Sequence, residues 1–195
     1  MGKVNPSGKF PFTFPVALNE SPAHNLNTFP GENLVTNYKE GILVGYRWYD
    51  TKKITPLFPF GYGLSYTNFD YAALHTGKKV YNFNETLTAF NETLTATIKI
   101  KNTGKLAGKE TVQLYVSKAS SAIERAEKEL KAFKKVMIPA GGEVTVTLNI
   151  PVKDLAYYDE KSMKWVVEPG TYKLLAGTSS QDIRATETFN IIGDK

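Results

Sequence analysis

Carboxylates are the side chains of this sequence with the most obvious hydrolytic chemistry, because glycosidases and aspartyl enzymes both work with pairs of them. The candidates are Asp50, Asp70, Asp154, Asp159 and Glu160. Each of them falls at a predicted strand edge or turn, and acidic residues in such places are usually exposed to solvent. We therefore expect none of them to be catalytic.

Other catalytic patterns are missing from the sequence. No GxSxG motif places a serine on a sharp turn that His24 or His75 could serve as base. The segment GYGLSY lacks both the lysine of a phosphate-binding loop and the glycine spacing of a dinucleotide turn. With no cysteine and two histidines, thiol chemistry and a zinc site made by histidines alone are excluded. The sequence predicts neither a metal nor a cofactor.

Aromatic residues are the remaining candidates for ligand contact, because a flat ring can stack on the apolar face of a sugar. The sequence suggests Trp165 and Tyr157 for such a contact, with Trp48 and Tyr158 as further candidates. The alternative, which we favour, is that these rings pack in the core of a domain or between domains.

The charge and the hydropathy of the sequence limit the kinds of partner that we expect. The net charge is +5, but arginine occurs only at positions 47, 125 and 184, so the basic surface is nearly all lysine. Nucleic-acid sites favour the planar fork of arginine, and we therefore expect no nucleic-acid partner. No apolar run approaches the roughly 20 residues of a membrane span, and the segment MGKVNPSGKF lacks the apolar core of a secretory signal. We expect no membrane partner.

The first 66 residues predict a largely irregular segment, because they hold seven of the ten prolines and many turn signals. One short helix is predicted within it, over Tyr38 to Asp50. Its apolar residues share one side at helical spacing: Ile42, Leu43, Tyr46 and Tyr49. Gly41 and Gly45 weaken the helix, so we expect it to form only against a partner.

From about Thr67 the sequence changes to short β-rich runs separated by turns. Apolar and polar residues alternate in residues 95–100 and 144–148, as they do in half-buried strands. The pattern predicts a mainly β fold, an antiparallel sandwich of the immunoglobulin or fibronectin type III kind with about seven strands.

Two segments leave alternatives open. Residues 120–136 carry apolar residues at helical steps, with Ser121 and Glu124 as a capping box, although a seven-strand sandwich needs a strand there. The heptapeptide FNETLTA occurs twice in succession, at 83–89 and 90–96. Since a step of seven reverses the face of a strand, we expect one copy to be the strand and the other an extended lead-in.

The stretch PLFPFGYGLSY, residues 56–66, combines four aromatic rings with two glycines and two prolines. Proline disfavours a helix and an interior strand alike, so the stretch is predicted to be a loop. Exposing so many rings to water is unfavourable, and we expect the loop to pack between two elements as a joint.

Three quoted segments together resemble the C-terminal portion of family 3 glycoside hydrolases, the β-glucosidase and β-xylosidase group. They are NPSGKFPFTFP at 5–15, YKEGILVGYRWYDTKKITPLFPFGYGLSYTNFDY at 38–71, and KELKAFKKVMIPAGGEVTVTLNI at 128–150. The resemblance implies that residues 1–66 are the tail of an α/β sandwich domain and the joint after it. Residues 67–192 would then be a fibronectin type III-like domain, with a strand over 128–138, although a local helix stays open at 120–127. The residues expected at the joint are Tyr46, Arg47, Trp48, Phe58, Phe60, Tyr62 and Tyr66.

The resemblance also implies what this chain lacks. The nucleophilic aspartate and the acid/base glutamate of the family lie in preceding domains, and no position here corresponds to either. We therefore expect this chain alone to hydrolyse no glycoside and to support an N-terminal barrel and an α/β domain that bind a β-linked saccharide. MGKVNPSGK resembles the interior of a longer protein, and the parent enzyme is expected to be periplasmic or secreted. The alternatives are a stand-alone carbohydrate-binding or adhesive module, and a plain spacer.

Overall fold

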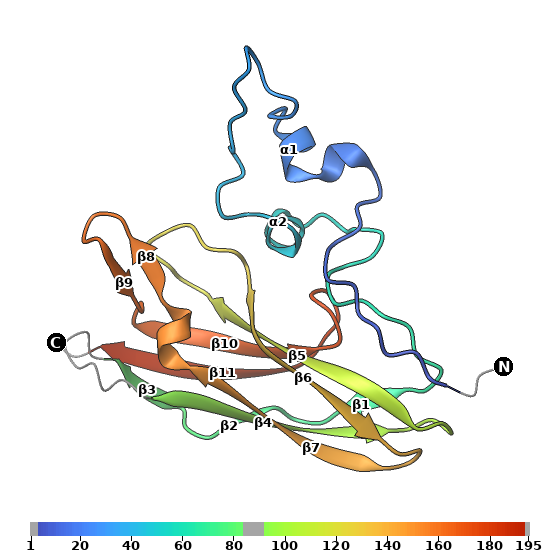
Figure 1. Ribbon diagram of the computed structural model, residues 1–195. Helices are drawn as coiled ribbons and strands as arrows, with labels where there is room; N and C mark the ends of the chain where they lie inside the picture. Colours follow the sequence, from blue (N-terminus) through green and yellow to red (C-terminus); the bar gives the residue numbers. More distant parts are fainter. Residues whose placement is uncertain (1–3, 84–91, 194–195) are drawn as a thin grey trace.

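The computed structural model describes residues 4–83 and 92–193. Two β-sheets face each other, and residues 4–66, here called the tail, lie along one side of them (Figure 1). The helical segments are η1 (Leu18–Glu20), α1 (Pro22–Asn25), α2 (Tyr46–Lys52) and η2 (Val152–Leu155). The strands are β1 (Phe69–Tyr71), β2 (His75–Thr76), β3 (Val80–Phe83), β4 (Thr93–Asn102), β5 (Gly108–Lys118), β6 (Glu129–Ile138), β7 (Glu143–Pro151), β8 (Tyr157–Asp159), β9 (Lys164–Val166), β10 (Gly170–Gly177) and β11 (Ile183–Gly193).

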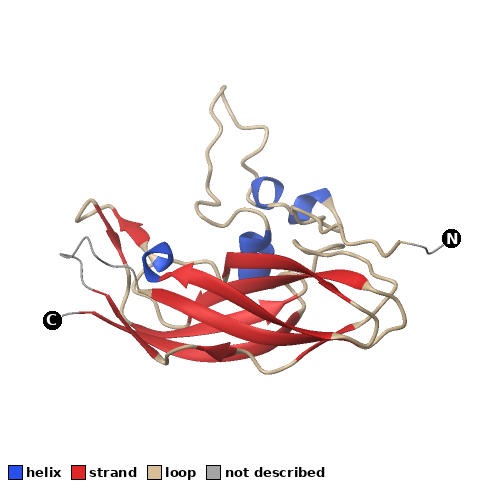
Figure 2. Cartoon of the chain, turned by 60° about the horizontal axis from the view of Figure 1, so that its bottom comes forward, coloured by secondary structure: helices blue, strands red, loops and turns tan. Residues whose placement is uncertain are grey.

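The sandwich predicted from the alternating runs is confirmed. One sheet is built around β4, which pairs with β7 on one edge and with β1 and β2 on the other. The other sheet has the order β3-β11-β10-β5-β6. Within the described residues the pairs are antiparallel except β3 with β11, which is parallel, so the second sheet is mixed rather than purely antiparallel. The two α-helices lie on one side of the two sheets (Figure 2).

The core fills the space between the sheets, and the period-two pattern of the sequence produces it. In β4, Leu94, Ala96, Ile98 and Ile100 are each at most 1% exposed, while the residues between them are more accessible. In the facing sheet the inward side chains include Leu114, Leu174 and Phe189. Burying one face of each sheet in this way is the main stabilising contribution of a sandwich.

Strand β5 departs from the alternation because both of its faces are covered. Val112 and Leu114 belong to the core, yet Thr111, Gln113 and Tyr115, which alternate with them along the strand, are also buried. The tail lies over this second face, and the side chain of Gln113 donates hydrogen bonds to the backbone oxygens of Gly61 and Thr178. Buried polar side chains in a strand thus mark the tail-covered face.

The alternatives at residues 120–136 are decided in favour of the strand. Strand β6 pairs with β5 from Glu129 to Ile138, as predicted for 128–138. Residues 120–127 form no helix. The side chain of Ser121, expected to cap a helix, instead donates a hydrogen bond to Glu168 at 2.6 Å, and Glu168 also accepts from the backbone of Ala122. A partner distant in sequence has replaced the local cap.

The helix predicted over Tyr38 to Asp50 is wrong in its extent. Helix α2 begins at Tyr46, and residues 38–45 are irregular. Gly41 and Gly45 have φ angles of +55° and +58°, which lie in the left-handed region and end any right-handed helix. The apolar spacing in this segment arises from packing of the irregular chain, and Leu43 is buried while Ile42 is 50% exposed.

The tandem repeat falls mostly outside the described residues. Phe83 ends β3, and residues 93–96 of the second copy open β4. The expectation of one strand copy and one lead-in copy therefore stays a prediction.

Asn102 closes the end of the sandwich next to the tail. It is completely buried, and its Oδ1 accepts hydrogen bonds from Thr67 Oγ1 at 2.5 Å and from the backbone of Gly104 at 3.0 Å. Its Nδ2 donates to the carbonyl oxygens of Leu106 and Ile138 at 2.8 and 3.1 Å. One amide therefore joins three loops and strands with every bond satisfied.

Replacing this amide with a carboxylate of the same shape tests its role. Asn102→Asp keeps the acceptor but loses both donated bonds and places a buried charge beside two carbonyl oxygens. We expect the free energy of unfolding, measured with urea, to fall by about 3 kcal/mol. The matched control is Asn190→Asp, which is exposed and keeps its acceptor for Thr171, with an expected change below about 0.5 kcal/mol. Equal effects of the two substitutions would contradict this role.

Candidate functional site

The joint predicted at residues 56–66 is a loop that pairs with the start of the tail. Phe14 and Phe58 form a β-bridge, with backbone N–H···O distances of 2.8 and 3.2 Å. The backbone N–H of Phe10 donates to Tyr62, and that of Gly61 donates to Phe10, both at 2.8 Å. Neighbouring rings of this cluster have centroids 4.6 to 6.2 Å apart: Phe10, Phe12, Phe14, Phe58 and Tyr62.

The same loop is fixed to the five-stranded sheet at Gly61. The backbone oxygen of Phe60 accepts a hydrogen bond from Ser180 N at 2.9 Å, and that of Gly61 accepts from Gln113 Nε2 at 3.2 Å. Gly61 has a φ of +81°, and a Cβ there would meet the Gln113 side chain at 2.1 Å. Glycine is required for both reasons.

Helix α2 brings three joint residues onto the sandwich. The Tyr46 ring stacks on Phe60 at 4.9 Å and meets Tyr115 edge-on at 5.9 Å, and its hydroxyl accepts from the backbone of Leu130. Trp48 is buried in a second small core, which also contains Leu43, Tyr49 and Ala126. Arg47 Nη2 lies 3.1 Å from Glu129 Oε1. Tyr66, which was also expected at the joint, has a side chain that is 65% exposed.

A buried ion pair joins α2 to the segment before β6. Asp50 Oδ2 lies 3.1 Å from Lys128 Nζ, and Gln181 Nε2 donates to Asp50 Oδ1 at 3.2 Å. The expectation that Asp50 is solvated at a turn is wrong: it lies in α2 and is 5% exposed, because the tail folds back onto the sheet. Burial raises the pKa of Asp50, and Lys128 acts in the opposite direction.

A second buried carboxylate, Glu110, lies where the tail meets the open end of the sandwich. Its Oε1 accepts from the Tyr71 hydroxyl at 2.9 Å and lies 3.8 Å from Lys9 Nζ of the tail. Burial raises the pKa of Glu110, with Lys9 opposing the shift, and burial also raises the pKa of Tyr71. Neither Asp50 nor Glu110 was distinguished from surface acids by the sequence.

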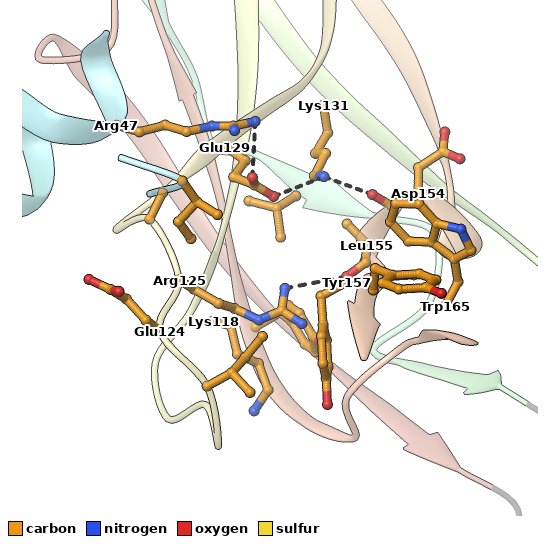
Figure 3. A pocket seen from close by; sticks show the side chains of 17 residues that line it. Arg47, Lys118, Glu124, Arg125, Glu129, Lys131, Asp154, Leu155, Tyr157 and Trp165 are labelled. Carbon is orange, nitrogen blue, oxygen red and sulfur yellow. Dashed lines mark hydrogen bonds and ion pairs between the residues drawn. The ribbon is translucent and has the colours of Figure 1, made fainter. Parts of the chain in front are cut away.

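The aromatic candidates for sugar contact separate into two groups. Trp48 is 3% exposed, whereas Trp165 is 68% exposed on β9 and meets Tyr158 of β8 edge-on at 5.6 Å. Tyr157 and this pair line a groove of about 510 Å³, here called the hairpin groove, between the β8–β9 hairpin, α2, the ends of β5 and β6, and residues 123–126 (Figure 3).

Charged side chains on the wall of the hairpin groove form a connected chain. Glu129 lies between Arg47 and Lys131, at 3.1 and 3.0 Å, and Lys131 Nζ donates to the backbone oxygen of Asp154 at 2.7 Å (Figure 3). Burial acts to raise the pKa of Glu129, but Lys131 and the neighbouring arginines outweigh it and hold the pKa below its usual value. Arg125 lies over the Tyr157 ring at 5.0 Å.

Sequence analysis placed Arg47 at the joint but missed Arg125, Glu129 and Lys131 as groove residues. Two of the three arginines, Arg47 and Arg125, line the same groove, but they are far apart in the sequence and only the fold brings them together. Of the remaining candidate acids, Asp70, Asp154 and Glu160 are exposed, and Asp159 accepts from Ser162 Oγ at 2.6 Å within the hairpin turn.

In the described ranges, no group of three or more His, Asp or Glu side chains is placed to hold a metal. No helix among the described residues has the length and apolarity of a membrane span.

The fold and the joint define a fibronectin type III-like sandwich with a tail packed on one sheet, and residues 110–180 match the model of the family Fn3-like, fibronectin type III-like domain. The chain is 45% identical over 193 residues to a β-glucosidase of Bacteroides ovatus and 48% identical over 190 residues to thermostable β-glucosidase B of Acetivibrio thermocellus. It covers 98% and 97% of its own length in these matches, and 25% and 24% of the relatives. It therefore corresponds to the C-terminal part of a family 3 glycoside hydrolase, as the resemblance indicated.

Solved structures agree with this assignment. The crystal structure of a β-glucosidase from Bifidobacterium adolescentis superimposes with a TM-score of 0.86 at 38% identity, covering 97% of this chain and 26% of that one. β-Glucosidase 3B of Thermotoga neapolitana, in complex with α-D-glucose, gives a TM-score of 0.84 at 40% identity over 99% of this chain and 25% of that one. The chain thus spans about a quarter of the length of its relatives.

Removing one partner of the buried ion pair tests how strongly it holds α2. Lys128→Met leaves Asp50 buried and uncompensated, and we expect the free energy of unfolding to fall by about 3 kcal/mol. Fluorescence of the buried Trp48 reports the release of α2. The control is Lys53→Met, which breaks an exposed ion pair of Lys53 with Glu127 and should change stability by less than about 1 kcal/mol. A similar loss in both variants would contradict a special role for the buried pair.

The second buried carboxylate gives a pH-dependent prediction. Burial raises the pKa of Glu110 in the folded state above the ordinary value of 4.5. The stability that protonated Glu110 contributes is therefore present below about pH 4.5 and is lost as the pH rises through the raised pKa. Glu110→Gln keeps an acceptor for Tyr71 and has no charge to bury. We expect the variant to be more stable than the parent by about 1 kcal/mol at pH 7.

The advantage of Glu110→Gln should disappear near pH 4, which urea denaturation at several pH values would show. Glu143→Gln is the control, since the Glu143 side chain is 49% exposed and its effect should vary little with pH. A pH-independent effect of Glu110→Gln would contradict the raised pKa.

Proposed function

We propose that this chain is the non-catalytic C-terminal part of an exo-acting β-glycosidase and supports preceding catalytic domains, a barrel and an α/β domain. The observation that carries the proposal is the match of nearly the whole chain to about a quarter of each β-glucosidase, tail and sandwich together. A spacer or a free module would need only the sandwich, whereas in this chain the tail matches the β-glucosidases as well.

The exposed apolar residues of the tail support a docking role. The tail exposes large apolar side chains that no described element covers: Val16, Leu18, Leu34, Val35, Tyr38, Val44, Leu57 and Leu64. Leu34 is fully exposed in the turn closed by the bridge of Glu32 with Val35, and Tyr38 is 82% exposed. Such a concentration of apolar surface on one segment is typical of an interaction site. Its proposed occupant is the preceding α/β domain of the same enzyme.

The sugar that the enzyme cleaves is not set by this part of the protein. Two relatives at 38% identity carry different names, a β-glucosidase of Rhizobium radiobacter over 192 residues and an exo-α-(1→6)-L-arabinopyranosidase of Bifidobacterium breve over 193 residues. Hydrolysis of β-glucosides is the activity we propose for the whole enzyme, because most of the relatives named above are β-glucosidases. A pair of carboxyl groups about 5 Å apart across the bond, which retaining hydrolysis requires, would be supplied by the preceding domains.

A chimera tests the supporting role. The Bacteroides ovatus enzyme is truncated before the matched quarter and joined to this chain, and hydrolysis of p-nitrophenyl β-D-glucoside is measured. We expect activity from the chimera and none from either part alone. The matched variant carries Leu34→Ser, Val35→Ser and Tyr38→Ser. These residues are exposed in the chain alone, so its melting temperature should not change, but the chimera should lose at least about tenfold in activity.

An inactive chimera would contradict the supporting role if the tail and sandwich within it are folded. An active chimera unaffected by the three serines would contradict docking through this surface. Activity of the chain alone would contradict the non-catalytic assignment.

A further inference from the structure

We propose that the hairpin groove is a binding site for a neutral β-linked gluco-oligosaccharide, with Trp165 as the stacking platform. The proposal goes beyond the supporting role, since it assigns a ligand to this chain itself. Only the choice of glucose as the sugar rests on the proposed function.

Trp165 is the first observation. Its indole is 68% exposed on a three-residue strand, while Trp48 is 3% exposed. The edge-on contact with Tyr158 at 5.6 Å holds the ring in place, and the opposed pairing of Tyr158 with Trp165 across the hairpin puts both on one face. A fixed, exposed ring presents a flat apolar surface, which suits the C–H face of a gluco-configured pyranose whose hydroxyls are all equatorial.

The polar wall of the groove is the second observation. Figure 3 shows Arg47 and Glu129 on one side of the groove and Tyr157 and Trp165 on the other. Because Glu129 is held by Arg47 and Lys131, and Lys131 by a backbone oxygen, these donors and acceptors are positioned in advance. Such fixed polar groups beside an apolar wall orient a ligand without a large ordering penalty.

The charge balance selects a neutral ligand. Arg47 and Lys131 share Glu129, and Arg125 lies 3.6 Å from Glu168 and over the Tyr157 ring. Lys118, a fourth cation on the lining, donates to the backbone oxygen of Ser120 at 2.7 Å, and Arg125 Nη2 is buried without a hydrogen-bond partner. Three of the four cations thus have an acidic partner that an anion would have to displace. Hydroxyl groups can donate and accept at the edges of the ion pairs without breaking them. The groove is lined by Arg47 of α2 and Trp165 of β9 and has a volume of about 510 Å³, which favours a chain of sugars over a single one.

Titration of the 195-residue chain with cellohexaose tests the proposal. Trp165 dominates any change in emission, because the buried Trp48 is shielded, and isothermal calorimetry serves for the variants. We expect saturable binding by the parent, with glucose at least about tenfold weaker, and Trp165→Ala weaker than the parent by at least about tenfold. Trp165→Phe should be intermediate, since it keeps a smaller ring.

The matched control is Phe133→Ala, which removes an equally exposed ring, 68%, that lies on β6 outside the groove residues. It should bind cellohexaose within about twofold of the parent. Since Trp165 is exposed, Trp165→Ala should keep the melting temperature of the parent, which excludes a folding defect as the cause of lost binding.

Three results would overturn the proposal. The first is no emission change at about 10 mM cellohexaose, and the second is equal loss of binding in Trp165→Ala and Phe133→Ala. The third is that Trp165→Ala lowers the activity of the chimera while the parent chain binds no sugar, which would assign the groove to contact with the other domains. Binding by the chain together with an inactive chimera would contradict the supporting role and leave the groove intact.

Discussion

The covering of the five-stranded sheet by the tail is the constraint on which the other features depend. A sandwich sheet normally buries one face and exposes the other to water. Here Thr111, Gln113 and Tyr115 on the outer side of β5 are buried as deeply as core residues, because residues 46–62 of the tail lie over them. The tail has little core of its own. The cluster around Trp48 has four buried residues, and one of them, Ala126, belongs to the segment before β6 and not to the tail. The two parts therefore stabilise each other.

This interface uses directional bonds as well as apolar contact. Gln113, Ser180 and Leu130 bind backbone or hydroxyl oxygens of the tail, and the buried pair of Asp50 and Lys128 adds a charge contact. A buried ion pair adds little net stability compared with apolar residues, but it penalises every arrangement in which the partners are apart. The interface is thereby specific in register, which suits a joint that must hold two bodies in one orientation.

Sequence reasoning succeeded where a local pattern determines the structure. The alternation in residues 95–100 and 144–148 predicted β4 and β7, and the prolines and glycines of residues 56–66 predicted an irregular loop. It failed where a residue distant in sequence determines the outcome. Glu168 takes the hydroxyl of Ser121 that would have capped a helix, and the fold buries Asp50 beside Lys128, 78 positions away in numbering (128 minus 50). The spacing of Ile42 and Leu43 suggested a helix that does not form. The periodicity of apolar residues carries no information on the left-handed backbone at Gly41 and Gly45, which prevents the helix.

Arg47 connects the joint to the hairpin groove, and this connection bears on the alternatives to a supporting role. Its backbone belongs to α2, which lies at the joint, and its guanidinium forms one end of the chain of ion pairs in the groove. The groove is therefore complete only when the tail is docked on the sandwich. A plain spacer would have no reason to couple these two features, and a free binding module would place its site on the sandwich alone. Dependence of sugar binding on the docked tail is thus a property expected of a unit in which the joint and the groove act together.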